Sequence, residues 1–233
     1  MEDTDRTIQS RLNEVRCRVA QACVAAGRSP KSVGLIAVSK TFPNACIQEA
    51  HAIDQVDFGE NYAQELRDKA EALHSLAPPI HWHFIGRLQT NKAIYIAPHA
   101  YRVHAIERVE EAEALVRRAP GPVQGLLAVN VGGEAQKVGL STNQALTMAE
   151  ALTRVAGFRL CGLMTLPPPT ENPEDSAPYF SELADLAARG RAHGLPLDEL
   201  SMGMSHDFEV AIRHGATWIR VGSAIFGERL RAT

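Results

Sequence analysis

The sequence lacks the features that mark several specialised classes of protein. It has only 4 cysteines, in neither a CxxC pair nor a zinc-binding spacing, so we interpret them as reduced thiols of a cytoplasmic protein rather than a disulfide framework. No apolar run approaches the ~20 residues that a membrane-spanning helix needs. The N-terminal residues lack the basic start and apolar stretch of a signal peptide. The cysteines are Cys17, Cys23, Cys46 and Cys161.

An excess of charge of one sign is also missing. The chain has 24 basic and 27 acidic residues, which gives a formal net charge of -3. Proteins that bind nucleic acid or anionic membranes usually concentrate basic residues on one face, so we expect neither partner. Hydrophobic residues make up 45% of the 233 positions, as in ordinary globular proteins, which excludes disorder for the bulk of the chain. A chain of this length fits one α/β barrel domain.

Residues 1–28 predict an N-terminal helix, because apolar side chains recur there every three or four positions. Thr4 or Asp5 is placed to cap its start, and Gly27 followed by Pro30 is placed to end it. The apolar positions of this helix are Ile8, Leu12, Val15 and Val19.

Short apolar runs then alternate with amphipathic stretches. The predicted strands are 33–38, 55–58, 80–85, 100–105, 123–131, 158–164, 197–201 and 217–221. The clearest amphipathic stretches between them are 61–74, 107–118, 143–156 and 179–193. This alternation predicts an α/β protein with parallel strands joined by helical crossovers. About eight such units predict a single (β/α)8 TIM barrel domain over residues 1–233, with the first helix packed on it. A doubly wound open sheet is the alternative, although its GxGxxG fingerprint and the GxxxxGK[ST] phosphate loop are both missing.

Lys40 is the most informative single residue. It follows the apolar run 33–38 with only Ser39 between them. At the carboxyl end of a barrel strand a side chain points into the mouth of the barrel, where active and binding sites are built. Partial burial there favours the neutral amine, which attacks aldehydes to give a Schiff base. The alternative is a lysine that extends from the strand end into solvent.

Two turns rich in small residues resemble phosphate-binding turns. Segments 200–207 and 219–227 each close a predicted strand and open a helix, with Ser205 and Ser223 in the expected N-cap positions. In barrels, the loops after strands 7 and 8 are a common phosphate site, helped by helix N-termini. Each turn also has a glycine that permits close approach of the backbone to an anion. These glycines are Gly203 and Gly222. The alternative is that the serines only cap their own helices.

Two charged residues lie beside these turns. Arg220 is on the eighth predicted strand, where burial is costly unless the guanidinium is paired. It therefore contacts either a ligand atom or an acidic partner within the barrel. Asp207 argues mildly against an anion at the first turn, unless its side chain faces away.

The remaining polar positions carry weaker signals. Asn61 is a candidate helix cap that could also reach a ligand. His81 and His83 share one face of a strand, but no third ligand lies in register, so we predict no metal site. The loop 167–173 is either a lid or a surface connection stiffened by proline. Other polar groups are interpreted as solvent-exposed: Arg87, Gln89, Asn91, Lys92, Glu134, Lys137 and Gly139.

Taken together, these motifs closely resemble the pyridoxal 5′-phosphate homeostasis proteins of the YggS/PROSC type. The matching segments occur in the same order along nearly the whole chain, at 37–41, 58–62, 83–92, 162–164, 200–207 and 221–227. Two small departures are His206, where other members often have an acidic residue, and Ser223, where some have threonine.

The resemblance implies a barrel like the N-terminal domain of alanine racemase, with pyridoxal 5′-phosphate held as an internal aldimine on Lys40. An arginine facing the pyridine nitrogen leaves it unprotonated, because arginine does not readily give up a proton. The ring is then a poorer electron sink. The implied cofactor contacts are Ser205, Gly222 and Ser223 for the phosphate, Met204 and Asn61 for the pocket wall, and Arg220 for the ring nitrogen.

The related racemases carry a second domain that completes their site, and we expect none here, since the sequence ends at Thr233, soon after the last predicted strand. A two-base racemase needs an acid or base on each face of the cofactor; Lys40 offers one, and Cys161 is interpreted as a core residue. We therefore expect no catalytic residues and a monomeric carrier that buffers pyridoxal phosphate or delivers it to client enzymes. A weak amino-acid racemase and a cofactor-free lysine aldolase are the alternatives.

Overall fold

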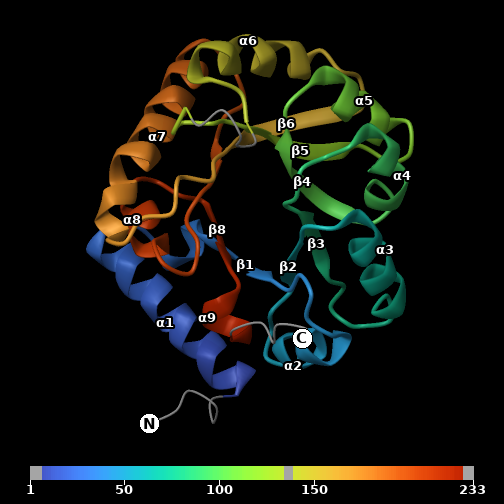
Figure 1. The fold of residues 1–233 in the computed structure, drawn as a ribbon, viewed down its shortest axis with the longest axis vertical. Helices are drawn as coiled ribbons and strands as arrows, with labels where there is room; N and C mark the ends of the chain where they lie inside the picture. Colours follow the sequence, from blue (N-terminus) through green and yellow to red (C-terminus); the bar gives the residue numbers. More distant parts are fainter. Residues whose placement is uncertain (1–6, 134–138, 228–233) are drawn as a thin grey trace.

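The computed structural model describes residues 7–133 and 139–227. Within these residues, parallel strands β1 to β8 close into a barrel, each paired with its neighbours in chain order (Figure 1). Closure is completed where β1 pairs with β8, with Leu35 opposite Ile219. The strands are β1 Gly34–Val38, β2 Asp57–Glu60, β3 His81–Phe84, β4 Ala100–Ile106, β5 Val123–Ala128, β6 Phe158–Met164, β7 Glu199–Ser201 and β8 Trp218–Val221.

Helices form a ring around this barrel (Figure 1). The α-helices are α1 Ile8–Ala25, α2 Asn44–His51, α3 Ala63–Ala72, α4 Ala93–Ile96, α5 Val109–Val116, α6 Thr142–Thr153, α7 Ala177–Ala192, α8 Phe208–Arg213 and α9 Ser223–Phe226. Short 3-10 turns lie at η2 Pro30–Ser32, η3 Thr90–Lys92 and η4 Pro173–Ser176. The barrel prediction is therefore confirmed over the open sheet. No residue range was predicted for two of the short helices, α2 and α4.

The N-terminal helix lies outside the barrel and packs against α2, α8 and α9. Its apolar stripe, which includes Leu12 and Val15, is buried. Gly27 ends the helix with a φ of +66°, a conformation that suits glycine. Thr7 is the N-cap, and its hydroxyl accepts a hydrogen bond from the Ser10 N–H. The two residues predicted to cap this helix lie outside the described residues.

Apolar packing occurs on both sides of the strands. The main core lies between the barrel and the helices and includes Leu127. Its neighbours Leu126 and Ala128 belong to a second, smaller apolar cluster. Because successive strand residues face opposite sides of a sheet, this second cluster fills part of the barrel interior.

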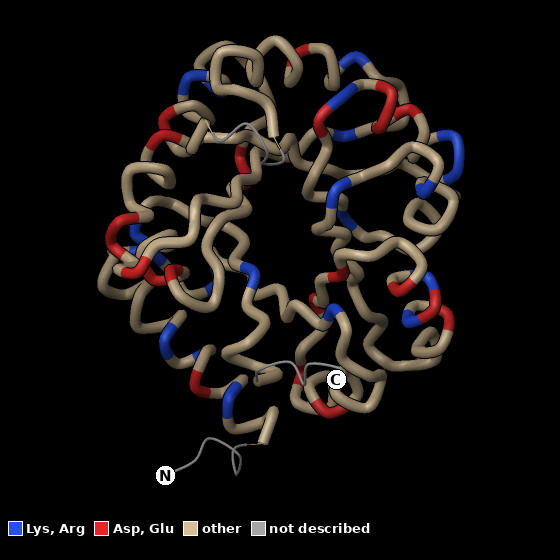
Figure 2. Tube along the Cα trace, viewed as in Figure 1, with Lys and Arg blue, Asp and Glu red and all other residues tan. Residues whose placement is uncertain are grey.

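Charged residues are distributed around the whole ring of helices. Basic and acidic segments are interspersed along the chain trace (Figure 2). Within residues 7–133 and 139–227, no helix combines the length and the apolar character that crossing a membrane requires.

Candidate functional site

A cavity of about 720 Å³ lies at the mouth of the barrel. Its residues come from the carboxyl ends of β1, β2, β3, β6, β7 and β8 and from the segments that follow them, where barrel proteins build their sites. The cavity brings together all seven residues predicted to contact the cofactor: Lys40, Asn61, Met204, Ser205, Arg220, Gly222 and Ser223. Six further residues that the sequence did not single out as cofactor contacts complete the lining: Val38, Phe42, Ile85, Leu166, His206 and Gly227.

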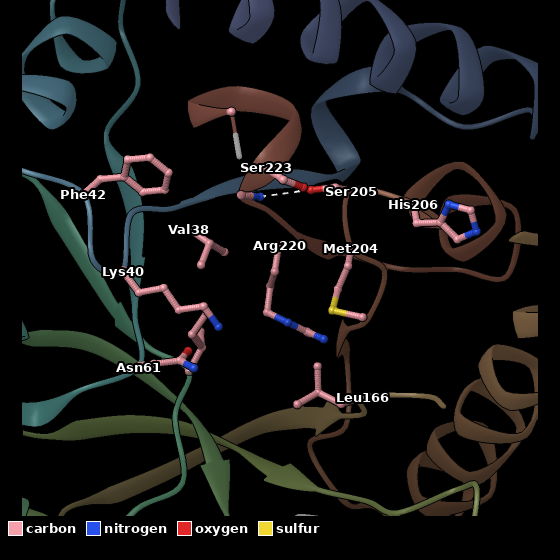
Figure 3. Close-up of a pocket in the computed structure, with 13 residues that line it drawn as sticks. Val38, Lys40, Phe42, Asn61, Leu166, Met204, Ser205, His206, Arg220 and Ser223 are labelled. Atoms are coloured by element: carbon pink, nitrogen blue, oxygen red, sulfur yellow. Dashed lines mark hydrogen bonds between the residues drawn. The ribbon is translucent and has the colours of Figure 1, made fainter. Parts of the chain in front are cut away.

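The side chain of Lys40 is half-buried and extends toward the centre of the cavity. Figure 3 shows its amine beside Asn61, with Arg220 across the cavity. Lys40 follows the end of β1 by two residues, so the strand places the amine at the barrel mouth as expected. The arrangement sets one amine against one guanidinium within a largely apolar wall.

An ion-pair cluster holds the backbone on both sides of Lys40. The Lys69 ammonium, on α3, donates to the carbonyl oxygen of Ser39 at 2.7 Å. The Glu65 carboxylate accepts from the Thr41 N–H at 2.6 Å. Lys69 also donates to Glu65 at 2.7 Å, so the two side chains that hold the backbone are themselves hydrogen-bonded to each other. Thr41 has a φ of +68°, a left-handed conformation that costs a β-branched residue energy and needs such support.

Glu60, at the end of β2, completes this cluster below the loop. Its Oε1 accepts hydrogen bonds from the Ser39 hydroxyl at 2.7 Å and from Lys69 at 2.8 Å. Its Oε2 is buried with no hydrogen-bond partner in the part of the chain that the structure describes. Burial raises the pKa of Glu60 to about 7, although Lys69 and Ser39 oppose the shift. The sequence reading had not singled out this cluster.

This raised pKa predicts how stability depends on pH. The folded protein holds a proton on Glu60 that the unfolded chain releases near pH 4.5, so the contribution to stability is lost as pH rises toward about 7. Between pH 4.5 and pH 8 the free energy of unfolding of the wild type should fall, relative to that of Glu60→Gln, by on the order of 2–3 kcal/mol. Denaturant unfolding at both pH values measures this difference in the free energy of unfolding. The Glu150→Gln variant, which changes an exposed carboxylate, is the control. A constant difference across that range would contradict the assignment.

The two turns predicted to bind phosphate meet at one side of the cavity. The Ser205 hydroxyl accepts a hydrogen bond from the backbone N–H of Gly222 at 3.2 Å (Figure 3). It accepts a second from the N–H of Ala224 at 3.4 Å. The turn after β7 is thus joined to the turn after β8. Gly203 has a φ of +92°, and a Cβ there would lie 2.6 Å from the Cβ of Ala211. Only glycine fits this closely packed, left-handed position.

Three helix-cap predictions near the cavity were wrong. Asp207, not Ser205, is the N-cap of α8, and Gly222, not Ser223, is the N-cap of α9. Tyr62 rather than Asn61 precedes α3. The Asp207 carboxylate is buried and accepts from the Met204 N–H at 2.7 Å, so it is used within its own turn. The Ser205 hydroxyl instead accepts from N–H groups at the start of α9, and both serines and Asn61 line the cavity.

Arg220 is buried in the barrel wall and held at two nitrogens. Its Nη1 donates to the Ser201 hydroxyl at 2.5 Å and its Nη2 to the Thr165 carbonyl at 2.8 Å. Burial lowers the pKa of Arg220 to about 10, with the charge of Asp207 opposing. The guanidinium therefore keeps its proton at neutral pH. Its hydrogen-bond partners are a hydroxyl and a carbonyl rather than the acidic partner considered from the sequence.

The other polar candidates lie away from the cavity. His81 and His83 both contact Asp57, at 3.2 and 2.9 Å. Within residues 7–133 and 139–227, no group of three or more histidine, cysteine or carboxylate side chains is arranged to hold a metal ion. Cys161 is buried in β6. Arg87, Gln89 and Asn91 are exposed, while Lys92 is half-buried and lies over the Tyr95 ring. Glu134 and Lys137 lie outside the described residues.

Comparison with known proteins agrees with this geometry. Residues 16–230 match the family model of the alanine racemase N-terminal domain. An alanine racemase from Corynebacterium glutamicum superimposes with a TM-score of 0.69 at 16% identity, covering 94% of this chain and 62% of that one, a likeness of fold alone. The fold and the site thus define a (β/α)8 barrel of the alanine racemase N-terminal type.

Closer relatives narrow the assignment. A pyridoxal phosphate homeostasis protein from Pseudomonas aeruginosa is 44% identical over 226 residues, 96% of each chain. One from Escherichia coli is 37% identical, covering 95% of this chain and 97% of that one. The structure of PipY from Synechococcus elongatus, with pyridoxal phosphate bound, superimposes with a TM-score of 0.78 at 35% identity, covering 90% of this chain and 100% of that one. The chain belongs to the pyridoxal phosphate homeostasis protein family.

Proposed function

We propose that this chain binds pyridoxal 5′-phosphate in the barrel-mouth cavity and serves in intracellular homeostasis of the cofactor, by buffering or delivering it. The observation that carries the proposal is the shared cavity, which places an amine, a guanidinium and a hydroxyl-bearing turn around one space. These groups match the aldehyde, the ring nitrogen and the phosphate of the cofactor. The names of the relatives support the same conclusion.

Each residue then has a defined role. Lys40 would hold the cofactor covalently, because an amine condenses with an aldehyde with release of water. The hydroxyls of Ser205 and Ser223 and the backbone at Gly222 bind the phosphate, at the joined turns described above. Arg220 faces the ring nitrogen and, because it keeps its proton, leaves that nitrogen unprotonated. Met204 and Asn61 form the wall beside the ring.

We propose a carrier rather than an enzyme. Stabilising a carbanion requires the cofactor ring to act as an electron sink, and an unprotonated ring nitrogen weakens that role. Racemisation also requires an acid or base on each face of the substrate. Among the described residues that line the cavity, none is a tyrosine, a cysteine or a carboxylate. His206 does line it, but its ring lies beyond Met204, on the side away from Lys40 (Figure 3).

The alternative, a weak amino-acid racemase, rests on that imidazole. It predicts turnover of alanine or serine enantiomers by the loaded protein, lost in both Lys40→Ala and His206→Asn. If the protein is a carrier, neither the loaded wild type nor the variants should turn over these amino acids faster than free cofactor does. Chiral chromatography of the incubated amino acids decides between them.

An absorbance titration tests the binding proposal itself. Adding pyridoxal phosphate to the purified protein should produce a Schiff-base band at about 420 nm that saturates at one equivalent. Pyridoxal, which has the aldehyde but lacks the phosphate, should give the same band only at much higher concentration. Equal affinity for the two compounds, or no band with either, would refute the proposal.

The setting in which the carrier works is also proposed. The four cysteines are free thiols, which suits the reducing cytoplasm. We propose that the carrier acts as a monomer and passes the cofactor to enzymes that depend on pyridoxal phosphate. A single species of about 25.3 kDa in analytical ultracentrifugation is the expected result, and a concentration-independent dimer would overturn it.

A further inference from the structure

A row of side chains, linked by hydrogen bonds, crosses the interior of the barrel and ends at the cavity. Asp57 Oδ1 lies 2.9 Å from His83 Nε2, and His83 Nδ1 lies 2.9 Å from His104 Nε2. His104 Nδ1 in turn lies 2.9 Å from the Ser201 Oγ, to which Arg220 donates. The first four residues come from β2, β3, β4 and β7, and Arg220 comes from β8. We call Asp57, His83, His104 and Ser201 the histidine chain.

This chain is buried where barrels usually pack apolar side chains. His83, His104 and Ser201 are each 0% exposed. A buried polar group without a partner costs stability, so each nitrogen and oxygen of the chain must be hydrogen-bonded. Asp57, the outer end, is half-buried and also contacts His81 at 3.2 Å.

With Asp57 ionised and both imidazoles neutral, one arrangement of hydrogens satisfies every member. A carboxylate only accepts, so His83 Nε2 carries a hydrogen and donates to Asp57. His83 Nδ1 then accepts from His104 Nε2. His104 Nδ1 accepts from the Ser201 hydroxyl, whose oxygen accepts from Arg220. Every donor therefore points from Arg220 toward Asp57.

The surroundings keep both imidazoles neutral. Burial lowers the pKa of His83, although the Asp57 carboxylate opposes the shift and Arg102 and His81 add to it. Burial also holds the pKa of His104 well below its usual value, reinforced by His83 and by the positive charges of Arg220 and Arg102. Neutral imidazoles have one donor and one acceptor each, as the one-way chain requires.

We propose that the histidine chain positions Arg220, fixing the direction in which its guanidinium meets the ring nitrogen of the bound cofactor. This inference rests on the proposed function, because it takes Arg220 to contact that nitrogen. The Ser201 hydroxyl hydrogen is committed to His104, so its oxygen is left to accept from Arg220. The Thr165 carbonyl holds the second nitrogen of the guanidinium at 2.8 Å. Without the Ser201 hydroxyl, the guanidinium keeps only its hydrogen bond to the Thr165 carbonyl and loses its fixed orientation.

The test compares two ligands on two variants. Ser201→Ala and His104→Gln interrupt the histidine chain without substituting Arg220 itself. Ser176→Ala and His51→Gln are matched controls, because Ser176 is equally buried and His51 nearly so, and they contact Thr170 and the Pro78 carbonyl instead. The ligands are pyridoxal phosphate and an analogue in which a carbon atom replaces the ring nitrogen.

We expect both variants of the histidine chain to raise the Kd for pyridoxal phosphate by about 10- to 100-fold, the effect of one hydrogen bond to a charged group. The Kd for the carbon analogue should change by less than about twofold, since that ring has no lone pair for Arg220 to meet. The control variants should change neither. Equal weakening of both ligands, or no weakening of either, would overturn the inference. Failure of the wild type to bind either ligand would instead overturn the proposed function.

Nitrogen-15 NMR of the cofactor-free protein supplies a readout that does not depend on binding. The wild type should show His83 and His104 both as the neutral tautomer with hydrogen on Nε2. In Ser201→Ala the His104 Nδ1 resonance should shift, because it loses its donor, whereas Ser176→Ala should leave it unchanged. A wild-type His104 with hydrogen on Nδ1 would contradict the direction of the chain.

Discussion

Replacing Lys40 by alanine is expected to abolish covalent capture of pyridoxal phosphate. The amine that extends into the cavity is the nucleophile of the proposed Schiff base, and no other cavity residue that the structure describes is a lysine. The band at about 420 nm should disappear, and borohydride should fix no cofactor to the protein. Because alanine is tolerated at a half-buried loop position, unfolding by denaturant should stay close to that of the wild type.

The control for this variant is Lys31→Ala, which removes an exposed lysine from η2. It should retain full capture. Capture that persists unchanged in Lys40→Ala, on another lysine, would contradict the assignment. Loss of capture in both variants would point to unfolding, which the denaturant curves would show.

The double variant Ser205→Ala, Ser223→Ala should have the second largest effect. Each lost hydrogen bond to a charged phosphate is worth about 1.5–3 kcal/mol, so each serine contributes roughly 10- to 100-fold in affinity. The two hydroxyls lie on turns that meet at the Gly222 N–H. Equilibrium dialysis should show the Kd for pyridoxal phosphate rising by at least about 100-fold.

Pyridoxal is the matched ligand for this experiment. It lacks the phosphate, so its weaker binding should be the same in the wild type and the double variant. A double variant that loses affinity for both ligands alike would show damage to the cavity as a whole. An unchanged Kd for pyridoxal phosphate would show that the phosphate binds elsewhere.

Much of the barrel could be predicted from the sequence because its strands are short apolar runs separated by clear breaks. The predicted run 158–164 coincides with β6, and 100–105 falls one residue short of β4. No residue range was predicted for helices α2 and α4, which have 8 and 4 residues. Helix α5 also has only 8 residues, but its apolar positions Val109, Ala112 and Val116 recur at helical spacing among acidic residues, so it fell within the predicted stretch 107–118.

The seven candidate cofactor contacts could be assembled into one site because the carboxyl ends of barrel strands converge. The supporting groups could not. Ser201 contacts His104 across 97 positions of sequence, and Glu60 is buried against Lys69 only once α3 packs on the barrel. Those contacts form between side chains on different strands, or between a strand and a helix. Local sequence patterns do not indicate which distant segments will meet. Helix caps near the cavity failed for a related reason, because Asp207 competed for the position given to Ser205.

The most direct measurement is peptide mass spectrometry after borohydride reduction of the protein saturated with pyridoxal phosphate. We expect a single pyridoxyl modification, on the peptide containing Lys40, at close to one per chain. The tag should be absent from Lys40→Ala and from protein reduced without cofactor. A tag confined to any other lysine, or no tag despite complete saturation, would contradict this expectation.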